Sequence, residues 1–250
     1  MNKKSIRPLI IRSNLILPKR VICGFTTRNG GISPPPFDSL NVGSHTSDDP
    51  LNIRENRRIV YNYLEVEETH VALMEQVHGK NISIVETGGI FPATDGLITS
   101  TSGVMLAVIV ADCIPLLLFD PVHNVIGALH CGWRSITAGA AEKTLKIMIK
   151  EFGTQPENVI AAMGPSAGPC CYETGEDTAE LFRSASVIRR DGGIYIDLKV
   201  ELKNRLLMVG LNSRNIEIFP DCTICNEKLY LSHRRNNVNS GRMMGYIMIK

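Results

Sequence analysis

The sequence predicts an α+β fold with mixed β-sheets. Strand-like segments outnumber helical ones along the chain, and the two kinds do not alternate one for one, as they do in a doubly wound parallel sheet. The 250 residues, of which 44% are hydrophobic, are enough for a sizeable core. No linker or internal repeat interrupts them. We therefore expect residues 1–250 to form one domain.

The expected strands are rich in Val, Ile and Leu and are bounded by Gly, Pro, Asn or Asp. They cover Leu9–Leu17, Val21–Thr26, Val71–Val77, Asn81–Val85, Val104–Val110, Leu116–Phe119, Val125–His130, Val159–Met163, Ile194–Ile196, Ile216–Phe219 and Tyr246–Ile249. The Asp191-Gly192-Gly193 step predicts a hairpin turn after Ser186–Arg190.

Four helices are expected, and their ends carry local signals. Asp49 followed by Pro50 is a typical start, and Gly153 and Gly210 are typical C-terminal residues. The expected helices cover Pro50–Leu64, Ile136–Phe152, Glu176–Ser184 and Leu198–Val209.

One long segment, Arg28–Asp48, has three glycines, three prolines and no periodicity. Long loops without secondary structure in compact domains are usually functional or disordered. The apolar side chains of Phe37, Leu40 and Val42 indicate that this loop packs down onto the domain. We expect it to form a wall of a site.

Charge and hydropathy exclude several classes of protein. A net charge of +2 without a long basic run argues against nucleic-acid binding. The N-terminal apolar stretches are interrupted by Arg12, Asn14 and Pro18, which argues against a signal peptide. The longest apolar runs, Val104–Val110 and Ile114–Phe119, are too short to cross a membrane. The expectation is a cytoplasmic protein without nucleic-acid or membrane partners.

Seven cysteines without an export signal indicate reduced thiols rather than a disulfide framework. Cys222 and Cys225 have the spacing of a metal knuckle, but no second pair of this form exists. Cys170, Cys171 and His233 are the only further soft ligands late in the chain. A structural zinc on these late residues is the alternative, but the missing second pair leads us to expect Cys222 and Cys225 to be reduced and free of metal.

Three residues follow expected strands at corresponding places. His78 and His130 each close a strand before a turn, and Cys113 lies in the turn after a third strand. Strand ends can direct such side chains into one cleft. Two imidazoles and a thiolate suit zinc, and three protein ligands leave a fourth position open. Two alternatives remain open at this point: a metal-free pair with Cys113 as nucleophile and His130 as base, or ordinary structural residues.

Other polar features have both a functional and a structural interpretation. The turn-rich Gly164–Gly168 loop could bind an anion, but it lacks the Lys-Ser/Thr ending of a P-loop. The Gly132–Ser135 segment opens a helix, and Arg134 could bind phosphate there. Asp112 and Glu173 could transfer protons or cap local backbone.

Several short motifs occur together and in a characteristic order. They are Arg28-Asn-Gly-Gly-Ile-Ser33, Ser39-Leu-Asn41, Gln76-Val-His-Gly79, Thr94-Asp-Gly96, Ala111-Asp-Cys-Ile-Pro115, His130-Cys-Gly-Trp-Arg134, Gly164-Pro-Ser-Ala-Gly-Pro-Cys-Cys-Tyr-Glu173, Cys222-Thr223, Ser232-His-Arg-Arg235 and Gly241-Arg-Met243. With these motifs the chain resembles the laccase-domain family, also called polyphenol oxidoreductase laccases and described as purine nucleoside phosphorylases. The resemblance runs from about Val21 to Ile249.

The resemblance implies an α+β fold in which mixed sheets pack together and are flanked by helices. It implies a metal centre, usually zinc, on the positions of His78, Cys113 and His130. It also implies phosphorolysis of adenosine, inosine, guanosine and methylthioadenosine, and deamination of adenosine, by a monomer or homodimer. Other members are described as copper-dependent phenol oxidases or as factors that edit peptidoglycan precursors. Asn29 and Ser232-His233 depart from the residues common in relatives, which leaves substrate preference open.

The residues help to rank these activities. A multicopper oxidase needs on the order of ten histidine ligands, whereas this chain has six histidines. The small number of histidines therefore argues against a phenol oxidase, although a copper ion could occupy a single site. One zinc with an open position suits Lewis-acid chemistry and activation of water, as in the zinc deaminases. The prediction is thus a zinc-dependent purine nucleoside phosphorylase with adenosine deaminase activity.

Four residues are predicted to bind its substrates by their charge, polarity and position in loops. Arg28 and Arg57 are expected to bind phosphate, and Asn41 and Gln76 to bind ribose or base. The alternative is a cysteine-type amide hydrolase that edits peptidoglycan precursors, with Cys113 as nucleophile. A domain that only stores metal would need a fourth ligand, and the sequence offers no clear one near the three.

Overall fold

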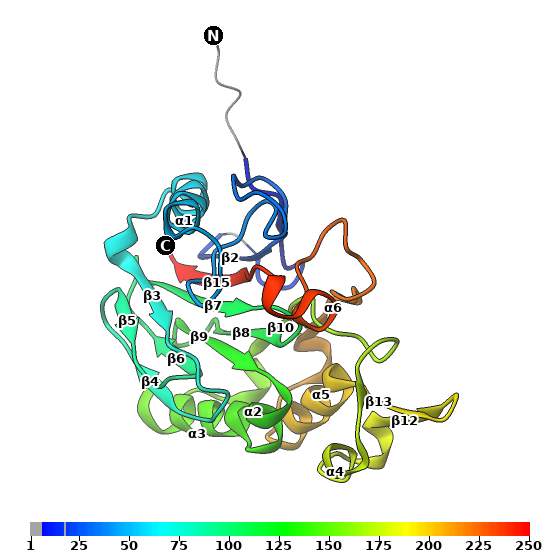
Figure 1. Ribbon diagram of the computed structural model, residues 1–250. Helices are drawn as coiled ribbons and strands as arrows, with labels where there is room; N and C mark the ends of the chain where they lie inside the picture. The colour runs from blue at the N-terminus through cyan, green and yellow to red at the C-terminus, as the bar shows by residue number, and fades with distance from the viewer. Residues whose placement is uncertain (1–6, 18) are drawn as a thin grey trace.

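The structure is a computed structural model that describes residues 7–17 and 19–250 (Figure 1). Residues 1–6 and Pro18 lie outside the described residues. They are part of the N-terminal segment whose sequence argues against a signal peptide. Within the described ranges, no helix has the length and apolar character needed to cross a membrane.

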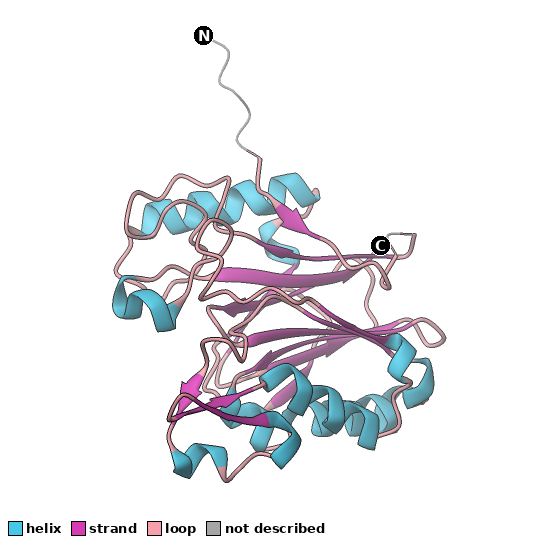
Figure 2. Ribbon diagram, turned by 90° about the vertical axis from the view of Figure 1, so that its right-hand side faces the viewer, coloured by secondary structure: helices cyan, strands magenta, loops and turns pink. Residues whose placement is uncertain are grey.

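Two six-stranded sheets pack face to face, with helices on the two outer faces (Figure 2). The strand order of the first sheet is β1 (Ile10–Ile11), β2 (Val21–Thr26), β15 (Met243–Ile249), β7 (Met105–Val110), β3 (Val71–Met74) and β5 (Gly89–Phe91). The strand order of the second sheet is β14 (Ile216–Ile218), β10 (Ile160–Met163), β8 (Ile114–Asp120), β9 (Val125–Cys131), β6 (Gly96–Thr99) and β4 (Ile82–Ile84). Each sheet contains parallel and antiparallel pairs, which confirms the α+β class with mixed sheets.

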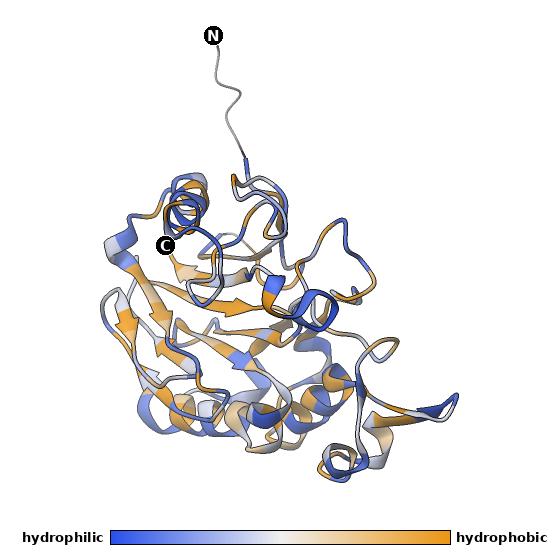
Figure 3. Cartoon of the chain, in the orientation of Figure 1, coloured by the Kyte–Doolittle hydropathy of each residue, from blue (hydrophilic) through white to orange (hydrophobic). Residues whose placement is uncertain are grey.

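The central strands are buried on both faces. In β8, Leu117 and Phe119 point into the layer between the sheets, whereas Leu116 and Leu118 point toward the helices of the second sheet. Strands that are covered on both sides appear in a sequence as continuous apolar runs without polar alternation. This explains why the strongest runs of the sequence are strands at the centre of the molecule (Figure 3).

Helix α1 (Pro50–Leu64) covers the outer face of the first sheet and has the predicted bounds. The Asp49 side chain accepts a hydrogen bond from the backbone N–H of Leu51, as expected for a helix start. Helices α2 (Trp133–Thr137), α3 (Ala140–Phe152) and α5 (Leu198–Met208) cover the second sheet.

Some elements differ from the sequence prediction. The helix expected over Ile136–Phe152 is divided into α2 and α3 at Gly139, whose φ of 81° is left-handed. Helix α4 (Glu176–Ala179) is shorter than expected, and α6 (His233–Asn236) was not predicted. The strands β5, β6 and β11 (Glu173–Thr174) were not predicted either.

A small third sheet contains the predicted hairpin. Its strands are β11, β13 (Gly193–Ile196) and β12 (Val187–Arg190). Arg190 pairs with Gly193, and the two residues of the turn both have positive φ. Positive φ at both positions is typical of the tight turn that the Asp-Gly step predicts.

One connection between the two sheets positions the site. The segment Ala111–Cys113 leaves β7 of the first sheet and leads into β8 of the second. The chain after β3 and the end of β9 lie at the same edge of the molecule (Figure 1). Residues from both sheets therefore meet where the chain crosses between them.

Candidate metal centre

His78, Cys113 and His130 are brought together at this crossing. Their ligand atoms lie within 4.8 Å of one another, and the two imidazole rings are 4.6 Å apart in a T-shaped arrangement. His130 at the end of β9 is buried, Cys113 is half-buried and His78 is exposed. The cluster is thus anchored in the core and open toward solvent on one side.

The buried carboxylate of Asp95 orients both histidines. One of its oxygens accepts hydrogen bonds from the backbone N–H of His78 at 2.8 Å and from Nδ1 of His130 at 3.1 Å. The other oxygen accepts from the N–H of Gly79 at 2.7 Å. Because a carboxylate only accepts, Nδ1 of His130 carries the proton and Nε2 is directed to the cluster.

Two residues of the site have a backbone conformation that is rare outside glycine. His78 has a φ of 57°, and Asp112, directly before Cys113, has a φ of 80°. Such conformations persist only where surrounding contacts enforce them, and they concentrate at functional sites. Asp95 holds the backbone at His78. Asp112 is held through its own carboxylate, which accepts from Thr223 Oγ1 at 2.6 Å and from the Arg234 N–H at 2.6 Å.

The thiol and the inner imidazole form an ion pair. Burial raises the pKa of Cys113, but the charge and hydrogen bond of His130, together with His78, outweigh it and lower that pKa to about 6. Burial lowers the pKa of His130, but the Cys113 thiolate and Asp95 outweigh it and raise that pKa to about 9. Near pH 7 the pair therefore consists of a thiolate and an imidazolium.

The backbone approaches the cluster at Gly132. A Cβ atom at this position would lie 3.0 Å from Cys113 Sγ and 3.4 Å from His78 Nδ1. Gly132 has a φ of −78°, which other residues adopt, so the glycine is required by lack of space rather than by backbone strain. The backbone thus leaves room for a metal ion between two imidazole nitrogens and one thiolate, which is a donor set typical of an open zinc site.

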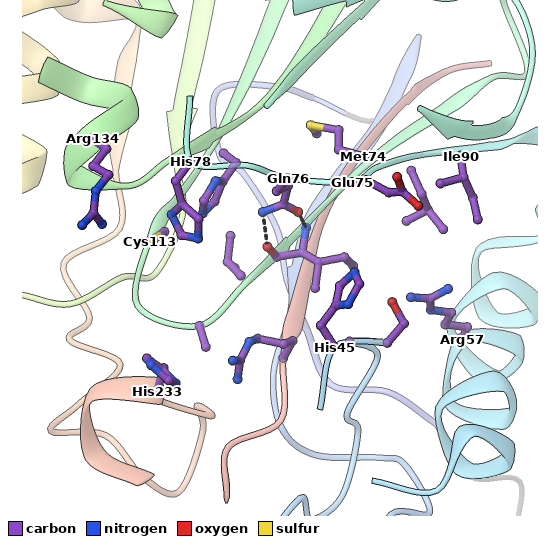
Figure 4. Close-up of a pocket in the computed structure, with 18 residues that line it drawn as sticks. His45, Arg57, Met74, Glu75, Gln76, His78, Ile90, Cys113, Arg134 and His233 are labelled. Carbon is purple, nitrogen blue, oxygen red and sulfur yellow. Dashed lines mark hydrogen bonds between the residues drawn. The ribbon is translucent and has the colours of Figure 1, made fainter. Parts of the chain in front are cut away.

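A pocket of about 610 Å³ opens from the cluster (Figure 4). Its volume is in the range of sites for small molecules. One wall is apolar and is formed by Leu73, Met74, Ile90, Ile109, Val110 and Ala111. The polar lining includes His45, Arg57, Glu75, Gln76, Arg134, His233 and Arg242. In Figure 4, Arg57 and His45 lie toward one end, and His78, Cys113 and Arg134 toward the other.

Two of the four predicted substrate-binding residues, Arg57 and Gln76, line this pocket. Arg57 projects from α1, and its Nε donates to the carbonyl of Val42 at 2.8 Å. The Gln76 amide makes two hydrogen bonds to the backbone of Ile109, at 2.8 and 3.0 Å (Figure 4). Gln76 therefore fixes β7 to the chain that carries His78. Its contact with a substrate stays a prediction.

Arg28 and Asn41 are not in the lining of this pocket. Arg28 forms a salt bridge of 2.8 Å with Asp38 and donates to the carbonyl of Glu227. Asn41 is fully buried, and its side-chain oxygen accepts from the N–H of Arg242 at 2.8 Å. In this arrangement both residues brace the loop Arg28–Asp48, and that loop supplies Gly43, Ser44 and His45 to the pocket. The loop is thus a wall of the pocket, as predicted.

Several residues of the site were not predicted to have a role in it, although Asp95, His233 and Arg242 lie within motifs that carry the family resemblance. The partners of Asp95 are 17 and 35 residues away in the chain. His45, His233 at the start of α6 and Arg242 reach the pocket from distant segments with no shared spacing. The proton-transfer candidate Asp112 is instead occupied by structural hydrogen bonds.

Comparisons with known proteins identify the family of this chain. The family model described as "Multi-copper polyphenol oxidoreductase laccase" matches residues 22–250. Purine nucleoside phosphorylase YlmD of Bacillus subtilis is 31% identical over 249 residues, which cover 93% of this chain and 90% of that protein. Purine nucleoside phosphorylase YfiH of Escherichia coli is 34% identical over 242 residues, which cover 93% and 95%.

A solved structure shares the whole fold. The crystal structure of YlmD from Geobacillus stearothermophilus has a TM-score of 0.91 and 31% identity, and the match covers 96% of each chain. The family match and these identities over nearly full length leave one assignment. The chain belongs to the polyphenol oxidoreductase laccase family.

Proposed function

We propose that the chain is a zinc-dependent purine nucleoside phosphorylase that cleaves adenosine, inosine, guanosine and methylthioadenosine, with adenosine deamination as a second activity. The observation that carries this proposal is a half-open His-Cys-His cluster at one end of a pocket whose lining includes three arginines, Arg57, Arg134 and Arg242. The names of the relatives support the same reaction. The cytoplasm, as its compartment, stays a prediction from cysteine usage.

The pocket offers an anion a strongly cationic lining. Arg57, Arg134 and Arg242 all line it, and in the part of the chain that the structure describes none of them forms a salt bridge. Arg242 is half-buried, and burial lowers its pKa, although Asp112 and Cys113 act in the opposite direction. A partly buried cation without a carboxylate partner is stabilised by a bound anion. Phosphate, the second substrate of phosphorolysis, is such an anion.

Other residues of the lining suit a nucleoside. Leu73, Met74 and Ile90 can pack against a purine ring, while His45 and Glu75 offer hydrogen bonds. In phosphorolysis a phosphate oxygen attacks C1′ of the ribose as the bond to the purine nitrogen breaks, and a proton must reach the leaving base. For deamination, Glu75 is the carboxylate in the lining that could move protons.

Zinc is the ion that the cluster fits best. When bound by His78, Cys113 and His130, it would supply Lewis-acid chemistry at the end of the pocket. The chain's own residues then hold the ligands in place: Asp95 fixes the His130 ring, and Gly132 leaves room for the cluster. Copper remains possible at one such site, but six histidines do not suffice for a multicopper oxidase.

The thiolate–imidazolium pair also favours a second candidate, the cysteine-type amide hydrolase. A thiolate beside an imidazolium is the arrangement of a cysteine nucleophile and its acid–base partner. The two candidates differ in their requirements, because a cysteine hydrolase needs neither phosphate nor metal.

The decisive test is base release from inosine, with and without phosphate and a strong chelator. We expect hypoxanthine and ribose 1-phosphate only when phosphate is present, and loss of activity after chelation that added zinc restores. Cys113→Ser should lose the metal at this site and the activity together. If no base is released and a peptidoglycan-precursor amide is cleaved at the same rate with and without the chelator, the hydrolase would be established instead.

Arg57 provides a test of the phosphate pocket. Arg57→Ala should raise the KM for phosphate roughly ten- to hundredfold, because a charge-assisted hydrogen bond contributes about 1.5–3 kcal/mol, and should change the KM for nucleoside less. Arg58→Ala is a matched control, since Arg58 is exposed and pairs with Glu55 outside the pocket. Equal effects of the two substitutions on phosphate would contradict the assignment.

Zinc affinity should depend on pH. Between about pH 6 and 9 the metal-free cluster holds a Cys113 thiolate and a His130 imidazolium, and the His130 proton must leave before its nitrogen can bind a metal. The affinity should therefore rise about tenfold per pH unit across this range and level off above pH 9. Competition titrations at several pH values measure the slope, and calorimetry in two buffers counts the released proton. An affinity that does not change with pH would disprove the ion pair.

Gly132→Ala tests how closely the backbone approaches the cluster. The new methyl group would crowd Cys113 Sγ, so zinc should bind at least about tenfold more weakly while the fold persists. Gly127→Ala in β9 is the control, because a Cβ there has no contact closer than 3.5 Å. Unchanged zinc affinity in Gly132→Ala would show that the ion does not lie at this point.

A further inference from the structure

A second cluster of soft ligands lies outside the site described above. Cys170 and Cys171 belong to the loop after β10, and Cys222 and Cys225 to the segment after β14. The four sulfur atoms all lie within 4.8 Å of one another. Cys225 Sγ is 3.4 Å from Cys170 Sγ and 3.2 Å from Cys171 Sγ. Residues about 50 positions apart thus converge on one point.

These distances resemble those of a metal site. Four thiolates around zinc, each about 2.3 Å from the ion, are about 3.8 Å apart, whereas bonded sulfurs are about 2.05 Å apart. The fold also overturns the reason for expecting Cys222 and Cys225 to lack metal. Their partners are not a second spaced pair but the adjacent residues Cys170 and Cys171.

The backbone is arranged to present all four thiols. Hydrogen bonds from the N–H groups of Cys171 and Tyr172 to the carbonyl of Gly168 form a tight turn that carries both adjacent cysteines. The Gly168 N–H itself donates to Cys222 Sγ at 3.2 Å. N–H donors of this kind stabilise a thiolate and orient it as a ligand.

Glycine at position 168 is required by the cluster. A Cβ there would lie 3.3 Å from Cys170 Sγ and 3.5 Å from Cys222 Sγ. Gly168 therefore has the same relation to this cluster as Gly132 has to the first one. Cations lie nearby: Arg190 donates to the carbonyl of Cys170, and the buried Lys199 ammonium donates to the carbonyl of Asp221. They would offset the negative charge of four thiolates around a divalent ion.

We propose that Cys170, Cys171, Cys222 and Cys225 form a second, structural zinc site. Four protein ligands close the coordination sphere, which is the arrangement of structural rather than catalytic zinc. The ion ties the loop after β10 to the segment after β14, and it adds to backbone hydrogen bonds between them such as that from the Thr223 N–H to the Ser166 carbonyl, at 3.0 Å. Thr223 also donates to Asp112, directly before Cys113. The second site therefore stabilises the turn that presents the thiolate of the first.

Zinc content of the full chain, purified under reducing conditions with zinc and freed of excess metal, tests the proposal. We expect two zinc ions per chain in the unaltered protein and one in Cys222→Ser. Cys113→Ser should also keep one, and its X-ray absorption should show only sulfur ligands at about 2.3 Å. Cys23→Ala, which removes a buried thiol outside both clusters, should keep two.

Two further measurements cover the case in which Cys222→Ser does not fold. Cys225→His should retain the second zinc, because three cysteines and one histidine also form structural sites. In the unaltered protein, the four thiols should resist alkylation until a chelator is added, although Cys170 and Cys225 are exposed. Three results would each overturn the proposal. The first is a single zinc per chain that is lost in Cys113→Ser, and the second is alkylation of all four thiols without chelator. The third is a disulfide among the four cysteines, seen as a mass that is lower by two hydrogens.

Discussion

The carboxylate of Asp95 is fully buried and joins segments that are far apart in the chain. It binds the backbone after β3, 17 residues away, and the ring of His130, 35 residues away. A buried carboxylate is costly unless hydrogen bonds satisfy it, so its position and those of its partners are mutually determined. If it were removed, the N–H groups of residues 77–79 would lose their acceptor, and the His130 ring would lose its orientation. The first metal centre thus depends on an acid that would not itself touch the metal.

The same interdependence explains the backbone around the cluster. His78 and Asp112 adopt left-handed conformations that are unfavourable for residues with a side chain. Each is stabilised by a carboxylate: His78 by that of Asp95, and Asp112 by its own, which binds Thr223, Ser232 and Arg234. The two sheets supply rigid strand ends, but these two carboxylates determine where the ligands point.

The sequence predicted those elements whose ends are determined by neighbouring residues in the chain. The bounds predicted for helix α1 agree with the structure, because Asp49 and Pro50 define its start without help from the rest of the chain. The sequence did not predict the break between α2 and α3 at Gly139. Glycine is tolerated inside helices, and its left-handed conformation at this position is seen only in the structure. The parallel strand β5 is three residues long and was missed, because its pairing with β3 rather than its sequence pattern defines it. Strand-end placement brought His78, Cys113 and His130 together in the prediction, whereas the hydrogen bonds that Asp95 makes with His78 and His130 could only be found in three dimensions.

The two cysteine-containing clusters show why residue type and spacing do not decide a metal site. The first combines one thiol with two imidazoles and opens into a pocket, so a fourth position would face the substrates. The second has four thiols, and none of them lines the pocket of the first. Both need a glycine, Gly132 or Gly168, so that the backbone can approach the sulfurs. The hydrogen bond from Thr223 to Asp112 connects the two clusters. A structural zinc at the second cluster would therefore help to hold the turn that presents Cys113 in the first. With zinc bound at both, the number of ligands that the fold brings to each point would give the two clusters their different chemistry.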